Sequence, residues 1–336
     1  MKPPSPYVLR VTCTIILDAL PCLSHERENH MSVAIISHKD CLLHEMGISH
    51  PEQPARIVAI ENELIRSGLE PLLEKHTSPM VTREQLIRAH APDYVDYIFQ
   101  ASPQIGMVAL DPDTSMNPYT LNAAMRAAGA LVYAVDLVMD GKIKAAFCNV
   151  RPPGHHAERA HAMGFCFFNN IAVGVAHALA HHKLSRIAII DFDVHHGNGT
   201  ENIFSNEARV LLCSSFEHPF YPFCGADTVS NHIINIPLPA RATGTLFRQE
   251  VEKKWLQQVR EFKPELIFFS AGFDAYKDDF LADLLFVESD YAWITQEIKK
   301  IAEASCQGRM ISTLEGGYNL DGLGRCAAAH IRALLD

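Results

Sequence analysis

The sequence predicts an α/β fold: a single domain in which a mainly parallel β-sheet is covered by helices on both faces. From Met31 onward, short apolar segments alternate with longer segments of helical periodicity, and this alternation is typical of β-α-β units with parallel strands. No internal repeat or low-complexity linker interrupts the pattern. With 336 residues, 48% of them hydrophobic and 20% charged, the chain has the composition of a globular protein with a large core.

The expected strands are short and rich in apolar residues: Val33–Ile36, Ala145–Val150, Ile187–Ile190, Val210–Cys213, Leu266–Ser270 and Met310–Leu314. The expected helices are amphipathic: Pro54–Arg66, Leu121–Met139, Asn170–His182, Leu246–Phe262, Asp290–Ala304 and, to the end of the chain, about Leu320–Leu335.

Residues 1–30 do not fit this pattern. Their apolar stretch is broken by Arg10, Asp18 and Pro21, which is unfavourable for the apolar core of a signal peptide. We therefore expect Met31 to be the natural or functional start and residues 1–30 to be a disordered leader, with a weak targeting peptide as the alternative. Residues 31–336 are expected to form the functional domain.

Charge and cysteine content exclude several classes of protein. A net charge of -10 argues against direct nucleic-acid binding, which needs a basic face; it favours either basic substrates or solubility alone. The nine cysteines form no C-x-x-C pair and several stand in apolar segments, as expected of reduced thiols in a cytoplasmic protein. No uninterrupted apolar run approaches the roughly 18 residues of a membrane span, so no membrane association is expected.

Polar segments follow four of the expected strands. They are R-P-P-G-H-H after Val150, D-F-D-V-H-H-G-N-G after Ile190, G-F-D after Ala271 and E-G-G-Y after Leu314. Open parallel sheets bind ligands at the carboxyl ends of their strands. The sequence therefore predicts one site at this edge of the sheet.

The segment after Ile190 predicts a metal site. In an extended chain Asp191, Asp193 and His195 would share a face, and Asp274 at another strand end is the natural third ligand beside Asp193 and His195. Three protein ligands with one open position are typical of catalytic zinc. Oxygen and nitrogen ligands also suit Fe²⁺, so the spacing leaves the metal open.

The adjacent His155 and His156 are suited to general acid–base chemistry beside a metal, because histidine titrates near neutral pH. Asp191 and Asn198 are the side chains expected to orient this pair. A pair of surface histidines is the alternative. Tyr318 could donate a hydrogen bond to a developing oxyanion, although the E-G-G-Y segment alone would better suit a strand-end turn with a core tyrosine.

Taken in order, R-P-P-G-H-H, G-F-C-F-F-N, D-x-D-x-H-H-G-N-G, S-A-G-F-D and E-G-G-Y resemble the motifs of the zinc-dependent histone deacetylase family, which includes acetylpolyamine-hydrolysing and bacterial members. The resemblance extends from Ser32 to the C-terminus and includes H-P-E-Q-P-A-R at His50–Arg56. It implies an arginase/deacetylase-like fold, with residues 31–336 as the catalytic domain.

The resemblance also implies roles for individual residues. The zinc ligands would be Asp193, His195 and Asp274, and the histidine pair would be His155, backed by Asp191, and His156, backed by Asn198 as in the class II branch. Tyr318 would stabilise the transition state, and Arg56 would lie at the channel floor near the acetate exit. The substrate channel would involve Asp113 at the rim, Gly164, Phe165, Tyr221 and Leu281. A structural K⁺ ion would be held by Asp191, Asp193, His195 and Ser214.

The resemblance implies a deacetylase that hydrolyses acetyl-lysine in proteins or peptides, with His156 taking the proton from the attacking water. Hydrolysis of acetylpolyamines is one alternative, and a noncatalytic acyl-lysine-binding subunit is another. Leu281 falls where polyamine-preferring relatives place an acid, which favours acetyl-lysine, although Asp279 and Asp283 are close by. A homo-oligomer is compatible with the sequence.

Three further features are interpreted as structural. His177 and His181 stand four apart on an expected, otherwise apolar helix and are expected to lack a nearby acid. His44, Glu45 and His50 do not have the spacing of an H-E-x-x-H motif. His196 is expected to have a structural or supporting role.

Overall fold

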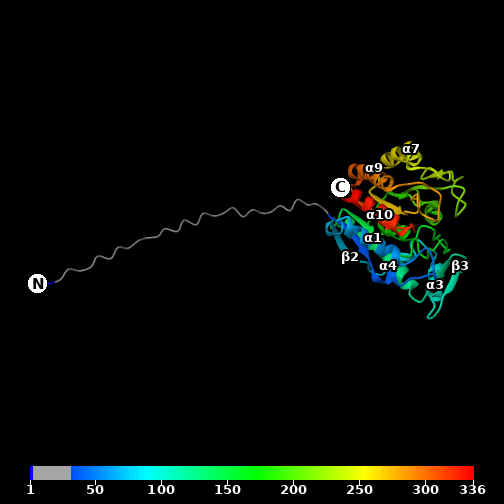
Figure 1. The fold of residues 1–336 in the computed structure, drawn as a ribbon, viewed down its shortest axis with the longest axis horizontal. Helices are drawn as coiled ribbons and strands as arrows, with labels where there is room; N and C mark the ends of the chain where they lie inside the picture. The colour runs from blue at the N-terminus through cyan, green and yellow to red at the C-terminus, as the bar shows by residue number, and fades with distance from the viewer. Residues whose placement is uncertain (3–31) are drawn as a thin grey trace. The chain divides into compact units, whose positions relative to one another are not determined.

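The computed structural model describes residues 1–2 and 32–336 (Figure 1). The fold is that of residues 32–336. The expectation of a disordered leader concerns residues that lie almost entirely outside the described part of the chain. It stays a prediction.

An eight-stranded sheet forms the centre of the fold, and all of its strand pairs are parallel. Its strands, in spatial order, are β2 (Leu73–Thr77), β1 (Val33–Ser37), β5 (Ala145–Cys148), β10 (Met310–Leu314), β9 (Leu266–Ala271), β6 (Ile187–Asp191), β7 (Val210–Glu217) and β8 (Ile233–Leu238). A separate antiparallel hairpin joins β3 (Val108–Asp111) to β4 (Thr114–Met116).

Helices cover both faces of the sheet (Figure 1). One hydrophobic cluster joins a face to α2 (Arg83–Leu86), α3 (Pro92–Ala101), α4 (Thr120–Met139), α5 (Asn170–Ala180) and α6 (Asn198–Phe204). The other cluster joins the opposite face mainly to α1 (Ala55–Arg66), α7 (Gly244–Lys254), α8 (Leu256–Phe262), α9 (Glu288–Cys306) and α10 (Leu320–Leu335). Two 3₁₀ turns, η1 (Lys39–Leu42) and η2 (Glu70–Leu72), complete the elements.

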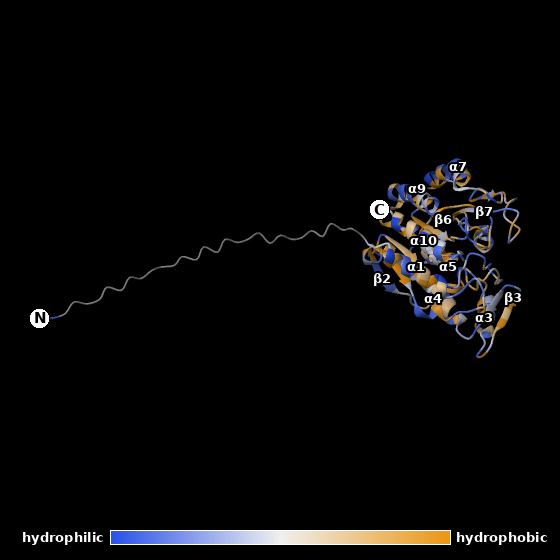
Figure 2. Ribbon diagram, in the orientation of Figure 1, coloured by the Kyte–Doolittle hydropathy of each residue, from blue (hydrophilic) through white to orange (hydrophobic). Residues whose placement is uncertain are grey.

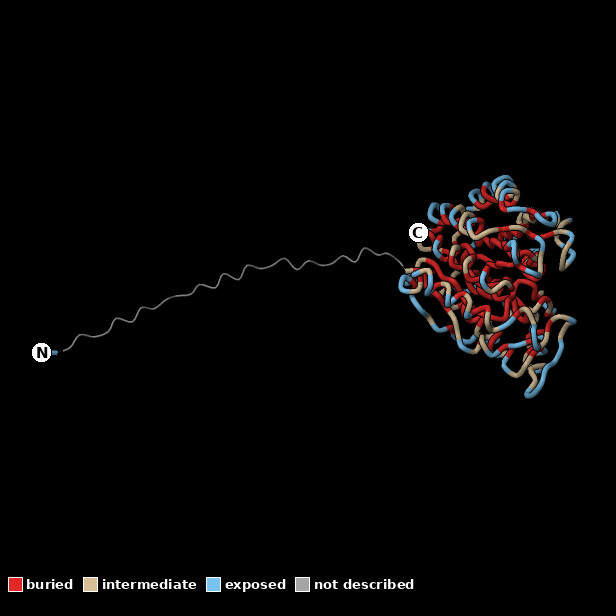
Figure 3. Tube along the Cα trace, viewed as in Figure 1, coloured by how far each residue is buried: buried red, intermediate tan, exposed pale blue. Residues whose placement is uncertain are grey.

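The central strands are apolar because both of their faces are buried. In β1, Ala34 and Ile36 pack into the cluster of α4 and α5, whereas Val33 and Ile35 pack into the cluster of α9 and α10. Figures 2 and 3 show the same arrangement, with apolar, buried chain at the sheet and hydrophilic, exposed chain on the outer sides of the helices. The predicted fold class is confirmed.

The two edge strands were not predicted: β2 lacks the apolar signature of the centre, and Asn235 and Pro237 interrupt the apolar run of β8. β2 reads L-E-K-H-T and buries only Leu73, and β8 contains Pro237, which is tolerated at a sheet edge. The short helices α3 and α6 were also missed. The helix expected at Leu246–Phe262 is divided into α7 and α8 at Trp255, which is fully buried.

By length and composition alone, α4 could cross a membrane. In the fold, 67% of its most apolar window is buried, as in the core helix of a folded protein. The seven described cysteines are all free, and all except Cys224 are buried.

Candidate active site

The four polar segments predicted at strand ends follow β5, β6, β9 and β10, which are neighbours in the sheet. Because parallel strands share one carboxyl edge, the segments meet there. Two further segments reach the same place: Phe220 and Tyr221, which follow β7, and Asp113 in the β3–β4 hairpin.

Asp193, His195 and Asp274 each offer one ligand atom, and these atoms lie within 4.8 Å of one another. His195 Nδ1 is 3.1 Å from Asp193 Oδ1 and 3.2 Å from Asp274 Oδ2. Burial lowers the pKa of His195, but the two carboxylates more than offset this and raise it to about 10. The same negative potential would attract a divalent cation.

The chain is not extended through this segment, so the alternate-residue argument used to group its ligands was wrong. β6 ends at Asp191, and the backbone N–H of His195 donates to Asp193 Oδ1 at 2.9 Å. A turn that closes on the Asp193 carboxylate therefore presents the ligands.

The donor set fits a zinc ion. Asp274 Oδ2 is buried and lies 3.2 Å from His195 Nδ1, but it accepts no hydrogen bond of good geometry from the described residues. Asp193 Oδ2 is held by the Gly316 N–H at 2.8 Å, and a Cβ on Gly316 would collide with Asp274. Two carboxylates and one imidazole, shaped by a glycine, match the three protein ligands of a catalytic zinc site.

His155 and His156 lie beside these ligands with their ring centroids 4.1 Å apart. His155 Nδ1 is 3.1 Å from Asp191 Oδ2, and His156 Nδ1 is 2.8 Å from Asn198 Oδ1. The partners differ in charge, and this separates the two rings chemically.

Burial lowers the pKa of His155, but the charges of Asp193 and Asp191 outweigh burial and raise it to about 10. For His156, burial and the positive charges of His155 and His195 all act in one direction and lower the pKa well below the usual value. At neutral pH the histidine pair therefore combines an imidazolium with a neutral imidazole.

Glu315, which sequence reasoning left without a role, holds the histidine loop. Its Oε2 accepts the N–H groups of Gly154 at 2.7 Å and His155 at 3.1 Å, and Ser270 Oγ donates to its other oxygen at 3.2 Å. Burial raises the pKa of Glu315 to about 7. The sequence signal that could have pointed to this role is that Glu315 is the first residue of the E-G-G-Y motif.

A cavity of about 230 Å³ opens above the metal ligands. All five residues expected in the substrate channel, Asp113, Gly164, Phe165, Tyr221 and Leu281, line it. The other lining residues are Pro153, His155, His156, His195, Phe220, Gly316 and Tyr318. Phe220 stacks on His195 at 5.6 Å between centroids, and Tyr221 meets His156 edge-on at 5.2 Å.

Tyr318 is buried at the cavity wall, and burial raises its pKa well above the usual value despite the nearby Arg56. The Arg56 guanidinium lies 4.9 Å from the ring centroid. Its Nε donates to Gly317 O at 2.7 Å, and it also donates to Glu315 O. Arg56 thus holds the backbone of the E-G-G-Y segment from behind.

At the rim, Asp113 Oδ1 accepts the Gly164 N–H at 3.0 Å. Of the three candidate gate residues, only Leu281 lines the cavity. The Asp279 carboxylate accepts hydrogen bonds from backbone N–H groups, including that of Leu281 at 3.0 Å. Asp283 is exposed.

The residues expected at a K⁺ site lie at neighbouring strand ends: Asp191 of β6 pairs in register with Ser214 of β7. His196 Nδ1 lies 3.0 Å from Ser214 Oγ, and its Nε2 lies 2.9 Å from Glu201 Oε2. His196 therefore links β7 to α6. The K⁺ ion stays a prediction.

The expectation that His177 and His181 lack a nearby acid was wrong. Asp136 of α4, distant in the sequence, places Oδ1 2.8 Å from His177 Nε2. His44, by contrast, is buried between Thr120 and Glu52, which agrees with a structural role.

Comparison with known proteins places this geometry in context. The family model of the histone deacetylase domain matches residues 50–334. An uncharacterized protein of Synechocystis sp. is 36% identical over 309 residues, which cover 90% of this chain and 99% of that protein. A probable deacetylase of Archaeoglobus fulgidus is 33% identical over 303 residues, covering 87% of this chain and 83% of that protein.

The crystal structure of the HDA15 HD domain matches with a TM-score of 0.85 and 32% identity, over 91% of this chain and 88% of that chain. This confirms the deacetylase-like fold that the resemblance implied.

Proposed function

Because this chain belongs to the histone deacetylase family, we propose that it is a zinc-dependent hydrolase that removes acetyl groups from lysine side chains in proteins or peptides. One observation carries the proposal. Asp193 and Asp274 meet His195, which lines the same cavity as His156 and Tyr318. A metal, a base and a hydroxyl donor around one reacting carbonyl are the groups that amide hydrolysis needs.

Asp193, His195 and Asp274 would hold the ion. When bound, zinc supplies Lewis acidity, which polarises the acetyl carbonyl and makes a water easier to deprotonate. Fe²⁺ would suit the same ligands.

His156 is the general base in this proposal. Its Nδ1–H donates to Asn198 Oδ1, so that Nε2 carries the free lone pair. Its lowered pKa keeps the ring neutral and able to accept a proton at neutral pH. The proton taken from water then passes to the departing lysine amine. His155, charged and paired with Asp191, contributes positive charge next to the developing oxyanion.

Tyr318 is the hydroxyl donor. Its raised pKa keeps the phenol protonated at working pH, and a donor that is already in position costs no reorganisation when charge develops on the carbonyl oxygen. Arg56, behind the ring, fixes the segment that carries it. Its role near the acetate exit stays a prediction.

The cavity wall favours acetyl-lysine over an acetylpolyamine. Phe165, Phe220, Tyr221 and Leu281 present apolar surface to the substrate, which suits the uncharged stem of acetyl-lysine. A polyamine carries further ammonium groups that an acidic gate would stabilise, and Leu281 offers none. Asp279 is occupied by backbone N–H groups.

Parallel assays of an acetyl-lysine peptide and acetylspermidine, with and without a chelator, test the proposal. We expect faster turnover of the peptide, loss of activity with chelator and recovery with Zn²⁺. Leu281→Glu should shift preference toward acetylspermidine, whereas Leu281→Met should not. Preference of the wild type for acetylspermidine would identify a polyamine hydrolase, and peptide binding without turnover would identify a noncatalytic reader.

A cytoplasmic location, a structural K⁺ ion and acetylated proteins as partners belong to the same proposal. The reduced-thiol pattern supports the first of these.

A further inference from the structure

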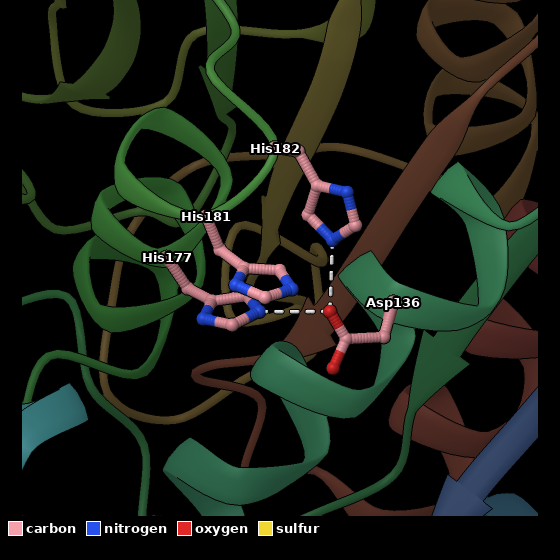
Figure 4. Close-up of side chains that lie close together, drawn as sticks. All are labelled: Asp136, His177, His181 and His182. Atoms are coloured by element: carbon pink, nitrogen blue, oxygen red, sulfur yellow. Dashed lines mark hydrogen bonds and ion pairs between the residues drawn. The ribbon is translucent and has the colours of Figure 1, made fainter.

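Asp136 of α4 and the three histidines at the end of α5, His177, His181 and His182, form a second cluster of metal-binding side chains (Figure 4). We call these four residues the histidine cluster. Each offers one ligand atom, and the four atoms lie within 4.8 Å of one another. None of the four residues lines the catalytic cavity.

The three imidazoles gather around one carboxylate oxygen. Asp136 Oδ1 lies 2.8 Å from Nε2 of His177 and 2.8 Å from Nε2 of His182. His181 stacks on His177 with a centroid distance of 5.0 Å and an interplanar angle of 14°. Figure 4 shows that each ring turns a nitrogen toward Asp136.

Helix geometry produces the arrangement. His177 and His181 are four residues apart, so they lie on the same side of α5. His181 is the C-cap, with its N–H still bonded to His177 O at 2.8 Å, and His182 follows where the helix has ended. The chain can therefore turn His182 back toward Asp136.

Hydrogen bonds within the histidine cluster do not give every ring a partner of its own. Asp136 Oδ1 is the partner of two rings, and the exposed ring of His181 has no hydrogen-bond partner among the described residues. Three imidazoles and a carboxylate are a ligand set suited to Zn²⁺, Ni²⁺ or Cu²⁺. Tetrahedral ligand atoms about 2.1 Å from a metal are about 3.4 Å from one another. The ligand atoms here lie within 4.8 Å of one another, so the most distant pair would have to approach by about 1.4 Å at most. His181, exposed, and His182, half-buried, are free to make such a shift.

One neighbour opposes binding. Arg88 Nη1 donates to His177 Nδ1 at 2.9 Å, which keeps the proton of His177 on Nε2, the atom that faces Asp136. His177 can ligate through Nε2 only if that proton moves to Nδ1, and Nδ1 then faces the Arg88 donor. Arg88 is exposed and can withdraw.

We propose that the histidine cluster binds a divalent transition-metal ion, with Asp136, His181 and His182 as ligands and His177 as the fourth once Arg88 moves away. Such an ion would crosslink α4 to α5 on the side of the fold away from the catalytic cavity. Because the unfolded chain lacks the assembled site, binding would stabilise the fold.

Metal content of the untagged full-length chain, equilibrated with micromolar free Zn²⁺, tests the proposal. The wild type should hold about one more Zn²⁺ per chain than His181→Ala/His182→Ala. Added Zn²⁺ should also raise the Tm of the wild type but not that of the double variant. His76→Ala is the matched control, because His76 is also a surface histidine paired to a carboxylate, at 2.8 Å from Glu74. It should keep the extra ion.

Arg88→Gln should strengthen zinc binding, whereas the double variant should lose it. The glutamine side-chain oxygen could accept a hydrogen bond from His177 Nδ1–H, which leaves Nε2 free to bind the metal. Zn²⁺ should therefore bind about tenfold more tightly, the size of effect typical of residues that orient a metal ligand. Circular dichroism establishes that each variant is folded. Equal zinc content in the wild type and the double variant, or weaker binding in Arg88→Gln, would overturn the proposal. Because the comparison is a difference between variants, it holds whether or not the catalytic site is loaded.

Discussion

Asp279 and Tyr318 are joined by a hydrogen bond of 2.6 Å from the Tyr318 backbone N–H to Asp279 Oδ2. The same oxygen accepts the Asn319 N–H at 2.9 Å, and Oδ1 accepts the Leu281 N–H at 3.0 Å. One buried carboxylate thus fixes both the proposed hydroxyl donor and the apolar residue at the channel wall.

Asp279→Asn should lower kcat by about 10–100-fold, because its amide N–H₂ would face backbone donors and release Tyr318, and misplacement by about 1 Å can cost that much. Metal content should be unchanged. Steady-state kinetics with Asp278→Asn as the matched control checks this, since Asp278 is an exposed neighbour paired to Lys277. Equal activity of the two variants would show that Asp279 does not position the tyrosine.

Tyr318→Phe should lower deacetylation by about 10²–10³-fold, the usual cost of losing one oxyanion donor, while metal binding persists. Tyr221→Phe removes a hydroxyl from the same cavity, and that hydroxyl has no hydrogen-bond partner among the described residues. It should keep most activity. Near-normal turnover by Tyr318→Phe would remove the tyrosine from the mechanism.

Asn198→Asp should move the acid limb of the kcat/KM profile to higher pH by about 1–3 units, because a carboxylate beside His156 raises its pKa. Because a base with a higher pKa is neutral only at higher pH, the acid limb moves to higher pH. Asn198 Nδ2 also donates to Glu158 Oε1 at 2.9 Å, so Asn198→Asp/Glu158→Gln is the cleaner variant. An acid limb unmoved in both variants argues against His156 as the base.

His90 should make the fold sensitive to acid. It is fully buried, donates Nδ1–H to Glu158 O at 3.0 Å and accepts the Asn169 N–H at 2.9 Å. Burial lowers the pKa of His90 from its ordinary value of 6.5 to about 4. As pH falls from about 6.5 to about 4, protons bind the unfolded chain but not the folded one, so stability falls by about 3 kcal/mol.

His90→Gln keeps a donor and an acceptor without this titration, so its stability should depend less on pH across that interval. Urea unfolding of both proteins at pH 7, 5.5 and 4.5 measures the difference. His330, whose pKa burial lowers to about 3, contributes acid sensitivity to both proteins alike and so cancels. Parallel pH profiles would contradict the assignment to His90.

Much of the fold was predictable, because the central strands are buried on both faces and must be apolar. The edge strand L-E-K-H-T of β2 was not, since pairing with β1 on one side, rather than its own hydrophobicity, makes it a strand. The divided helix at Trp255 likewise depends on packing that periodicity does not show.

The sequence by itself determined the chemistry available to this protein, because the kinds of side chain and their order fix the candidate ligands, the histidine pair and the tyrosine. Only the tertiary structure decided which partners meet. It turned Asp279 onto the Tyr318 backbone, placed Glu315 under the histidine loop and brought Asp136 to His177 from 41 positions away. The physical reason is that hydrogen bonds and metal ligation act over about 2–3 Å in space, and separation along the chain does not reveal that distance until the helices have packed.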